Sequence, residues 1–76
     1  MFKFWKRKWE KETAGHVMPY EQFKYKGAHF LRIGNPELNC VRCICLSSGE
    51  SYKQSEIYNL PFEINVLRKL QEWELM

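Results

Sequence analysis

Short runs of alternating apolar and polar residues, each ended by turn-forming residues, place the strongest constraint on how this chain folds. Side chains in a β-strand point alternately to opposite faces of the sheet, so such runs are typical of half-exposed strands. The runs span residues 20–26, 29–33, 40–46 and 62–66, with breaks at Gly27 and at residues 34–39, 47–51 and 59–61. Short strands between closely spaced turns predict an antiparallel sheet.

The spacing of apolar residues changes to three and four at both ends of the chain, which predicts helices there. At the N-terminus the residues with this spacing are Phe2, Trp5 and Trp9, and at the C-terminus they are Val66, Leu70 and Trp73. The first helix would cover residues 2–12 and end near Gly15, since glycine favours the conformation that ends a helix. The tail would form one or two helical turns.

These patterns predict a mainly β fold, a small curved antiparallel sheet or SH3-like barrel of four or five strands with short terminal helices. An α+β fold, with the C-terminal helix covering the sheet, is the alternative. We expect residues 1–14 to form a basic, Trp-rich helix and residues 15–76 to form a single domain. Within residues 29–33, we expect Leu31 and Ile33 to face the core.

The chain has 76 residues, of which 45% are hydrophobic and 16% aromatic, enough for one compact domain. It contains no Asp, and its sequence shows no phosphate-binding loop and no paired acid and base. We therefore expect a protein that is not an enzyme and that needs no cofactor. The oligomeric state stays open between monomer and dimer.

Three cysteines, Cys40, Cys43 and Cys45, lie close enough in sequence to suggest a zinc site, with His29 or His16 as a possible fourth ligand. The residues between the cysteines favour an extended chain, however, because two of them are β-branched and none is Gly or Pro. A strand would point Cys40 away from the other two thiols. We therefore expect no bound metal, and we expect Cys43 and Cys45 to be buried beside Val41.

The N-terminal segment is strongly basic, and its cations run into residues 9–12 without an intervening apolar stretch. A secretory signal would need such a stretch, so we expect a cytoplasmic protein with reduced cysteines. The predicted N-terminal helix could lie on an anionic membrane, with its tryptophans in the interface. Packing of those tryptophans against the domain is the interpretation we favour over a membrane role.

Two sets of residues are candidate binding surfaces. The first set is acidic and aromatic and would suit a protein partner: Tyr52, Tyr58, Trp73, Glu50 and Glu56. The second set is basic and aromatic and could bind nucleic acid: Lys24, Lys26, Phe30, Arg32 and Arg42, extended by Lys6, Arg7 and Lys8. The sequence pI of about 8.8 is mild for a dedicated nucleic-acid domain, so the protein-binding set is our leading expectation.

Seven residues in the central third of the chain form a pattern of strands and turns: Phe23, Gly27, Phe30, Asn39, Leu46, Gly49 and Glu50. In this pattern the chain resembles small phage and prophage proteins with a compact β-fold. The resemblance implies an accessory protein that binds and modulates or inhibits a host protein, without defined catalytic residues. Binding to nucleic acid is the alternative function, and peripheral membrane association is a lesser one.

Overall fold

The computed structural model describes residues 8–34 and 40–75, and this part of the chain is built almost entirely of β-strands. The strands are β1 (Trp9–Thr13), β2 (Gln22–Tyr25), β3 (Ala28–Arg32), β4 (Cys40–Ser47), β5 (Ile57–Pro61) and β6 (Asn65–Lys69). Two short 3-10 turns accompany them, η1 (Ala14–His16) and η2 (Glu72–Leu75). The fold is mainly β, as predicted.

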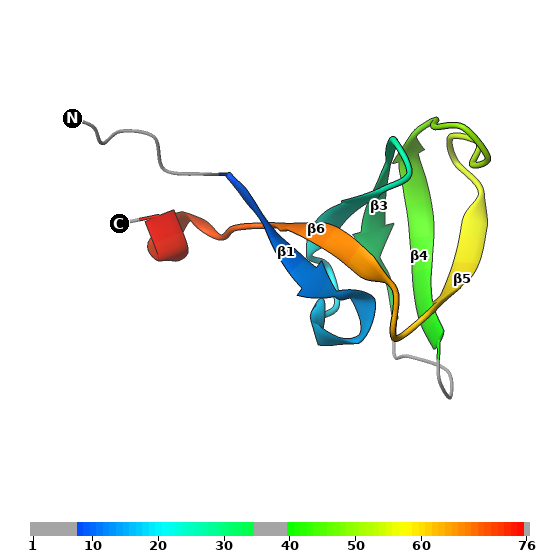
Figure 1. Cartoon of the computed structure of the whole chain (residues 1–76). Helices are drawn as coiled ribbons and strands as arrows, with labels where there is room; N and C mark the ends of the chain where they lie inside the picture. The colour runs from blue at the N-terminus through cyan, green and yellow to red at the C-terminus, as the bar shows by residue number, and fades with distance from the viewer. Residues whose placement is uncertain (1–7, 35–39, 76) are drawn as a thin grey trace.

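The six strands form one antiparallel sheet in the order β1-β6-β2-β3-β4-β5, which curls around its own core (Figure 1). A bulge between β3 and β4 adds to the curvature, because His29 pairs with Ser47 whereas Phe30 pairs with Cys45. The sheet stays open, and β1 and β5 form its two edges. The segments that follow the two edge strands meet at η1, where the backbone N–H of Gly15 donates to the carbonyl oxygen of Phe62 at 3.0 Å.

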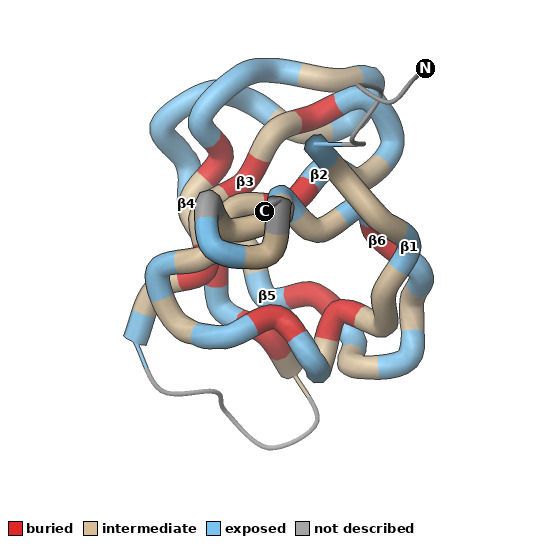
Figure 2. The backbone as a smooth tube through the Cα atoms, turned by 90° about the vertical axis from the view of Figure 1, so that its left-hand side faces the viewer, coloured by how far each residue is buried: buried red, intermediate tan, exposed pale blue. Residues whose placement is uncertain are grey.

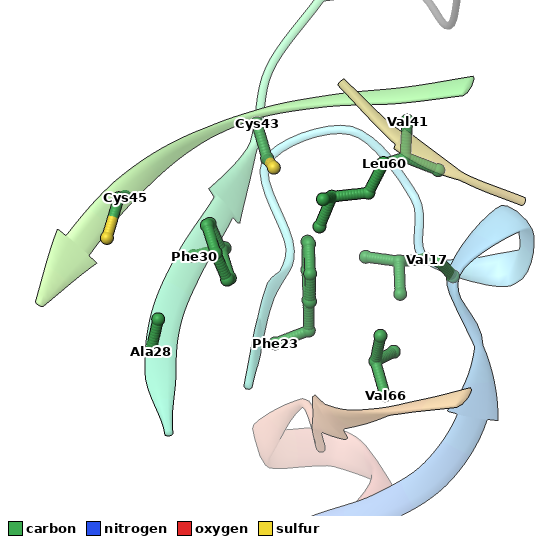
Figure 3. Close-up of a cluster of buried hydrophobic side chains, with 10 residues drawn as sticks. Val17, Phe23, Ala28, Phe30, Val41, Cys43, Cys45, Leu60 and Val66 are labelled. Carbon is green, nitrogen blue, oxygen red and sulfur yellow. The ribbon is translucent and has the colours of Figure 1, made fainter. Parts of the chain in front are cut away.

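The core lies on the concave face of the sheet, which we call the inner face (Figures 2 and 3). Its fully buried side chains come mainly from β2, β3 and β4, and the rings of Phe23 and Phe30 stack with their centroids 5.3 Å apart. The remaining members of this core cluster are Ala14, Val17, Ala28, Val41, Cys43, Cys45, Leu60 and Val66. Burial of each phenylalanine contributes about 1.5–3 kcal/mol.

An ion-pair cluster continues the inner face beyond the core. The guanidinium group of Arg68 contacts the carboxylates of Glu21 at 3.0 Å and Glu74 at 2.7 Å, and that of Glu10 at 3.7 Å. The hydrogen bond with Arg68 is the main reason that the pKa of Glu74 lies below its usual value. Since Glu74 belongs to η2, this cluster attaches the C-terminal turn to the sheet.

The predicted curved antiparallel sheet is confirmed, but three features of the prediction are wrong. The sheet has six strands instead of four or five, and it does not close into a barrel. The described residues also contain no α-helix at either end, and the predicted C-terminal turns are reduced to the 3-10 element η2. Trp9–Thr13 is a strand, because pairing with β6 at the far end of the chain overrides its local helical spacing.

In the C-terminal tail, strand pairing also overrides the local helical spacing. Asn65–Lys69 is a strand, and only Glu72–Leu75 forms a turn, as a 3-10 element. This excludes the α+β alternative for the described part of the chain. Most of the expected N-terminal helix, residues 1–7, lies outside the described residues. None of the helical segments described is long and apolar enough to cross a bilayer.

Two further local predictions are wrong. Residues 59–61 are part of strand β5 and not a break, because Pro61 occupies the last position of an edge strand, where proline is tolerated. The inward face of β3 carries Phe30 and Arg32, whereas Leu31 is only partly buried. The alternation itself is therefore present in β3, but it faces the opposite way from the prediction.

Candidate functional site

The register of the sheet separates the charges of the strands onto two faces. Glu10 pairs with Arg68 and Glu12 pairs with Val66, so both carboxylates share the inner face with the core. Lysine side chains occupy the convex face, which we call the outer face: Lys11, Lys24 and Lys69. Arg42 joins them, because it is exposed between two buried residues of β4. Within the six described strands, no carboxylate falls on the outer face.

The centre of the outer face is a cluster of aromatic and cationic side chains around Trp9. The ammonium nitrogen of Lys24 lies 4.3 Å from the centroid of the Trp9 ring, which is a cation–π distance. The His29 ring meets the Trp9 ring edge-on, with the centroids 5.2 Å apart. Lys69 is the cross-strand partner of Trp9 in the register between β1 and β6. We call these four residues the Trp9 cluster.

The surroundings of His29 in this cluster favour its neutral form. Its Nε2 atom lies 2.9 Å from the side-chain oxygen of Gln22, a hydrogen-bonding distance. Partial burial lowers the pKa of His29, and the positive charges of Lys24 and Lys69 lower it further. An anion placed between these lysines would reverse that effect, because a negative charge favours the protonated imidazole.

A hollow lies at one end of the Trp9 cluster, where β6 leaves the sheet. It has a volume of about 440 Å³, and its lining includes Lys8, Lys69, Tyr20 and Gln22 together with one acidic residue, Glu21, whose carboxylate is paired with Arg68. Tyr20 is 73% exposed and has a backbone φ of 70°, a left-handed conformation that is uncommon for a residue other than glycine. The hydrogen bond from its N–H to the carbonyl oxygen of Arg32, at 2.7 Å, stabilises this conformation. The fold thus presents an exposed aromatic ring beside two lysines.

A second hollow, the β2–β6 groove, lies on the other side of Lys24. It has a volume of about 580 Å³, and its cationic lining residues are Lys11, Lys24 and Lys26. Its apolar and aromatic lining residues are Tyr25, Val66 and Leu67. The outer face therefore carries lysines from one hollow, through the Trp9 cluster, to the other.

The residues of the predicted nucleic-acid set do not all lie together in the structure. Lys24 and Lys26 are exposed and line the same groove, and Lys8 lines the other hollow. Arg42 lies on the outer face but on β4, away from both hollows. Lys6 and Arg7 lie outside the described residues.

Phe30 and Arg32 do not belong to an exposed surface, which corrects the expected set. Phe30 is fully buried in the core, and Arg32 is 4% exposed. The Nη1 atom of Arg32 donates a hydrogen bond to the carbonyl oxygen of Val17, and burial lowers the pKa of the guanidinium group. Both residues lie on the inner face of β3, so neither side chain is available to a large ligand.

The predicted acidic and aromatic set is not assembled as one surface. Tyr52 and Tyr58 are partly buried and pack edge-on against each other, with ring centroids 4.9 Å apart. Trp73 is 71% exposed on η2, which lies at the opposite end of the molecule from the β4–β5 loop (Figure 1). Glu50 and Glu56 are exposed near the tyrosines. Two of the three expected aromatic residues are thus packed against the core.

The cysteines follow the predicted alternation. Cys43 and Cys45 are buried on the inner face beside Val41, whereas Cys40 is only partly buried, and this expectation is confirmed. The thiols of Cys43 and Cys45 contact the carbonyl oxygens of Tyr58 and Ser47. Burial raises the pKa of Cys43 to about 12, which keeps the thiol protonated.

The suggested zinc ligands are not brought together. His29 lies in the Trp9 cluster, on the face of the sheet opposite to Cys43 and Cys45. Among the side chains of the described ranges, no group of three His, Cys, Asp or Glu residues is placed to hold a metal ion. The structure therefore gives these cysteines a place in the core.

Sequence reasoning missed several outer-face residues: Trp9, Lys11, Tyr20 and Lys69. The spacing of the apolar residues predicts a helix over Trp9 and Lys11, although the alternation of charge in WEKET is also the pattern of a strand with opposite charges on its two faces. No pattern in the sequence indicated that Tyr20 is exposed, because its exposure depends on a hydrogen bond to β3.

Comparisons with protein-family models, with curated proteins and with solved structures find no match to this chain.

Proposed function

We propose that this chain is a non-catalytic binding module that holds single-stranded nucleic acid against the outer face of its sheet. The observation that carries the proposal is the separation of charge by the strand register, which leaves lysines on the outer face and carboxylates on the inner face. A surface of one charge sign attracts a partner of the opposite sign and raises its local concentration.

The composition of the outer face favours a nucleic acid among the possible polyanions. Five lysines lie in the two hollows and between them: Lys8, Lys11, Lys24, Lys26 and Lys69. The rings of Trp9 and of the exposed Tyr20 lie among these lysines. Proteins that bind single strands combine a basic track for the backbone with aromatic rings on which bases stack.

Docking of a host protein is the second candidate function, and a different part of the outer face favours it. Leu31, Ile44 and Ile57 are direct cross-strand neighbours on β3, β4 and β5, and Ile57 is 54% exposed. An aliphatic row bordered by polar residues suits the centre of a protein interface. The resemblance to phage accessory proteins supports this candidate, which would make the chain a modulator of a host protein.

Binding of a fluorescent thymidine oligonucleotide of about 12 residues would test the main proposal, with anisotropy measured as salt rises from about 50 to 200 mM. We expect the logarithm of the association constant to fall linearly with the logarithm of the salt concentration, by about 0.7 per phosphate contact. The variant Lys24→Gln should lower that slope by about 0.7. Lys53→Gln is the matched control, because Lys53 is also exposed but lies on the β4–β5 loop.

Two results would contradict the nucleic-acid proposal. One is an affinity that does not change with salt, and the other is an equal effect of Lys24→Gln and Lys53→Gln on the slope. If the variant Ile57→Asn abolishes capture of a host protein while oligonucleotide binding is absent, the second candidate function replaces the first.

A further inference from the structure

The β2–β6 groove exists because two neighbouring strands of the sheet separate. β2 and β6 pair over two positions only, Phe23 with Arg68 and Lys24 with Leu67. Beyond these pairs, β2 continues through Tyr25 to its turn with β3, while β6 continues toward Asn65 beside β1. The sheet is therefore split between Tyr25 and Val66, and the groove occupies the split.

The groove is apolar inside and cationic at its rim. Val66 is 4% exposed and belongs to the core, so the split reaches the hydrophobic interior of the domain. Leu67 remains 40% exposed between Lys11 and Lys24, its cross-strand neighbours on either side. Among the described residues that line the groove, none is acidic. A volume of about 580 Å³ is within the range of sites that hold small organic ligands.

The Tyr25 ring gives the groove an aromatic wall. On one side the ring packs against Tyr52, with the centroids 6.1 Å apart. The ammonium nitrogen of Lys26 lies 5.5 Å from its centroid. This distance is longer than the 4.3 Å between Lys24 and the Trp9 ring, so the contact of the exposed Lys26 is weaker and is more easily displaced. The ring is thus supported from within the core while its contact toward the groove is a mobile one.

We infer that the β2–β6 groove receives one nucleobase of the bound strand, with the lysines at its rim contacting the flanking phosphates. The inference rests on the proposed function. The base would lie against Tyr25 and Leu67, where stacking and apolar contact need no particular base edge. Lys11, Lys24 and Lys26 surround this position, so the phosphates on both sides of the inserted base meet positive charge. The other bases of the strand remain on the outer face.

Two thymidine oligonucleotides of equal length would test this inference, one of them carrying an abasic residue in place of every second nucleotide. Both have the same phosphate charge, so electrostatic attraction alone cannot distinguish them. We expect the complete strand to bind wild-type protein about tenfold more tightly, as expected for loss of base–aromatic stacking.

A pair of substitutions at Asn65 would locate the effect in the groove. Asn65 is exposed, lines the groove and occupies a strand position where a β-branched residue is well tolerated. Asn65→Ile fills part of the groove and should reduce the preference for the complete strand, leaving only the part that stacking on Trp9 and Tyr20 supplies. Asn65→Ser also removes the amide but leaves the space open, so the preference should persist. Tyr25→Leu, with its fold checked by circular dichroism, should lower the preference as Asn65→Ile does.

The outcomes separate this inference from the proposed function. Salt-dependent binding with no preference for the complete strand, or a preference unchanged in Asn65→Ile, would overturn base insertion and leave the outer face as a nucleic-acid surface. Absence of salt-dependent binding to either strand would overturn both. Equal binding of a glutamate-rich peptide of matched charge would also overturn base insertion, since it would show that the groove holds any polyanion.

Discussion

The ammonium nitrogen of Lys24 lies 4.3 Å from the centroid of the Trp9 ring, and this contact joins two strands that are not neighbours in the sheet. Trp9 is on β1 and Lys24 is on β2, so the pair crosses β6 on the outer face. The contact restricts a lysine that would otherwise sample many rotamers. A cation that is already oriented loses less entropy when it meets a phosphate.

Replacing Trp9 with leucine should weaken oligonucleotide binding, because the change removes an aromatic ring and releases Lys24. We expect a loss of about 1–3 kcal/mol in binding free energy, measured by fluorescence anisotropy at fixed salt. Trp73→Leu is the control, since Trp73 is 71% exposed but lies on η2, outside the Trp9 cluster. Equal losses in the two variants would show that the Trp9 cluster has no special role.

Protonation of His29 should destabilise the fold. Its pKa in the folded protein lies below the unfolded value of about 6.5, so the unfolded chain binds more protons near pH 6. The free energy of unfolding should therefore decrease as the pH falls from about 7.5 to about 5.5. Urea denaturation at the two pH values should show a smaller decrease for His29→Gln than for wild-type protein.

His16→Gln serves as the control for this experiment, because His16 is exposed and outside the Trp9 cluster. It should keep the decrease seen in the wild-type protein. Saturating oligonucleotide should oppose the effect, because phosphate beside Lys24 and Lys69 raises the pKa of His29. A decrease of the same size in His29→Gln would contradict the assignment.

Replacing Gly49 with alanine should destabilise the fold more than its position in a loop suggests. A Cβ atom at Gly49 would lie 2.5 Å from the backbone nitrogen of Ala28, which is too close unless the turn between β2 and β3 moves. We expect the free energy of unfolding to fall by about 1–3 kcal/mol, the range for overpacking. In urea denaturation, the exposed neighbour Ser48→Ala should change it by less than about 0.5 kcal/mol. Comparable values for the two variants would contradict this close packing.

Alkylation of the native protein should distinguish the three cysteines. Cys40 is partly buried, whereas Cys43 and Cys45 are almost completely inaccessible. The pKa of about 12 for Cys43 further suppresses the thiolate that reacts with iodoacetamide. Mass spectrometry after brief labelling near pH 8 should find a single adduct, at Cys40, and three adducts after unfolding. Early labelling of Cys43 would show that β4 is not a core strand.

Local patterning predicted the hairpin of β2 and β3 and the strand β4, but it missed β5, although β5 pairs with β4, the strand before it in the chain. The hairpin formed by β2 and β3 has a short turn, and Gly27 at φ 77° supplies the left-handed conformation that this turn requires. The burial of Cys43 and Cys45 followed from alternation along β4. The prediction is wrong at β1, because Trp9–Thr13 becomes a strand only by pairing with β6, which is distant in sequence.

The amino-acid sequence by itself determined a small mainly β protein with an alternating core strand and an excess of positive charge. Only the tertiary structure decided which charges act together. Register is a property of two strands, and a shift of one residue would move every side chain to the other face. The pairing of Glu10 with Arg68 therefore places Lys11 on the outer face with Leu67, and through Leu67 beside Lys24. This placement, which no single segment encodes, creates the cationic surface.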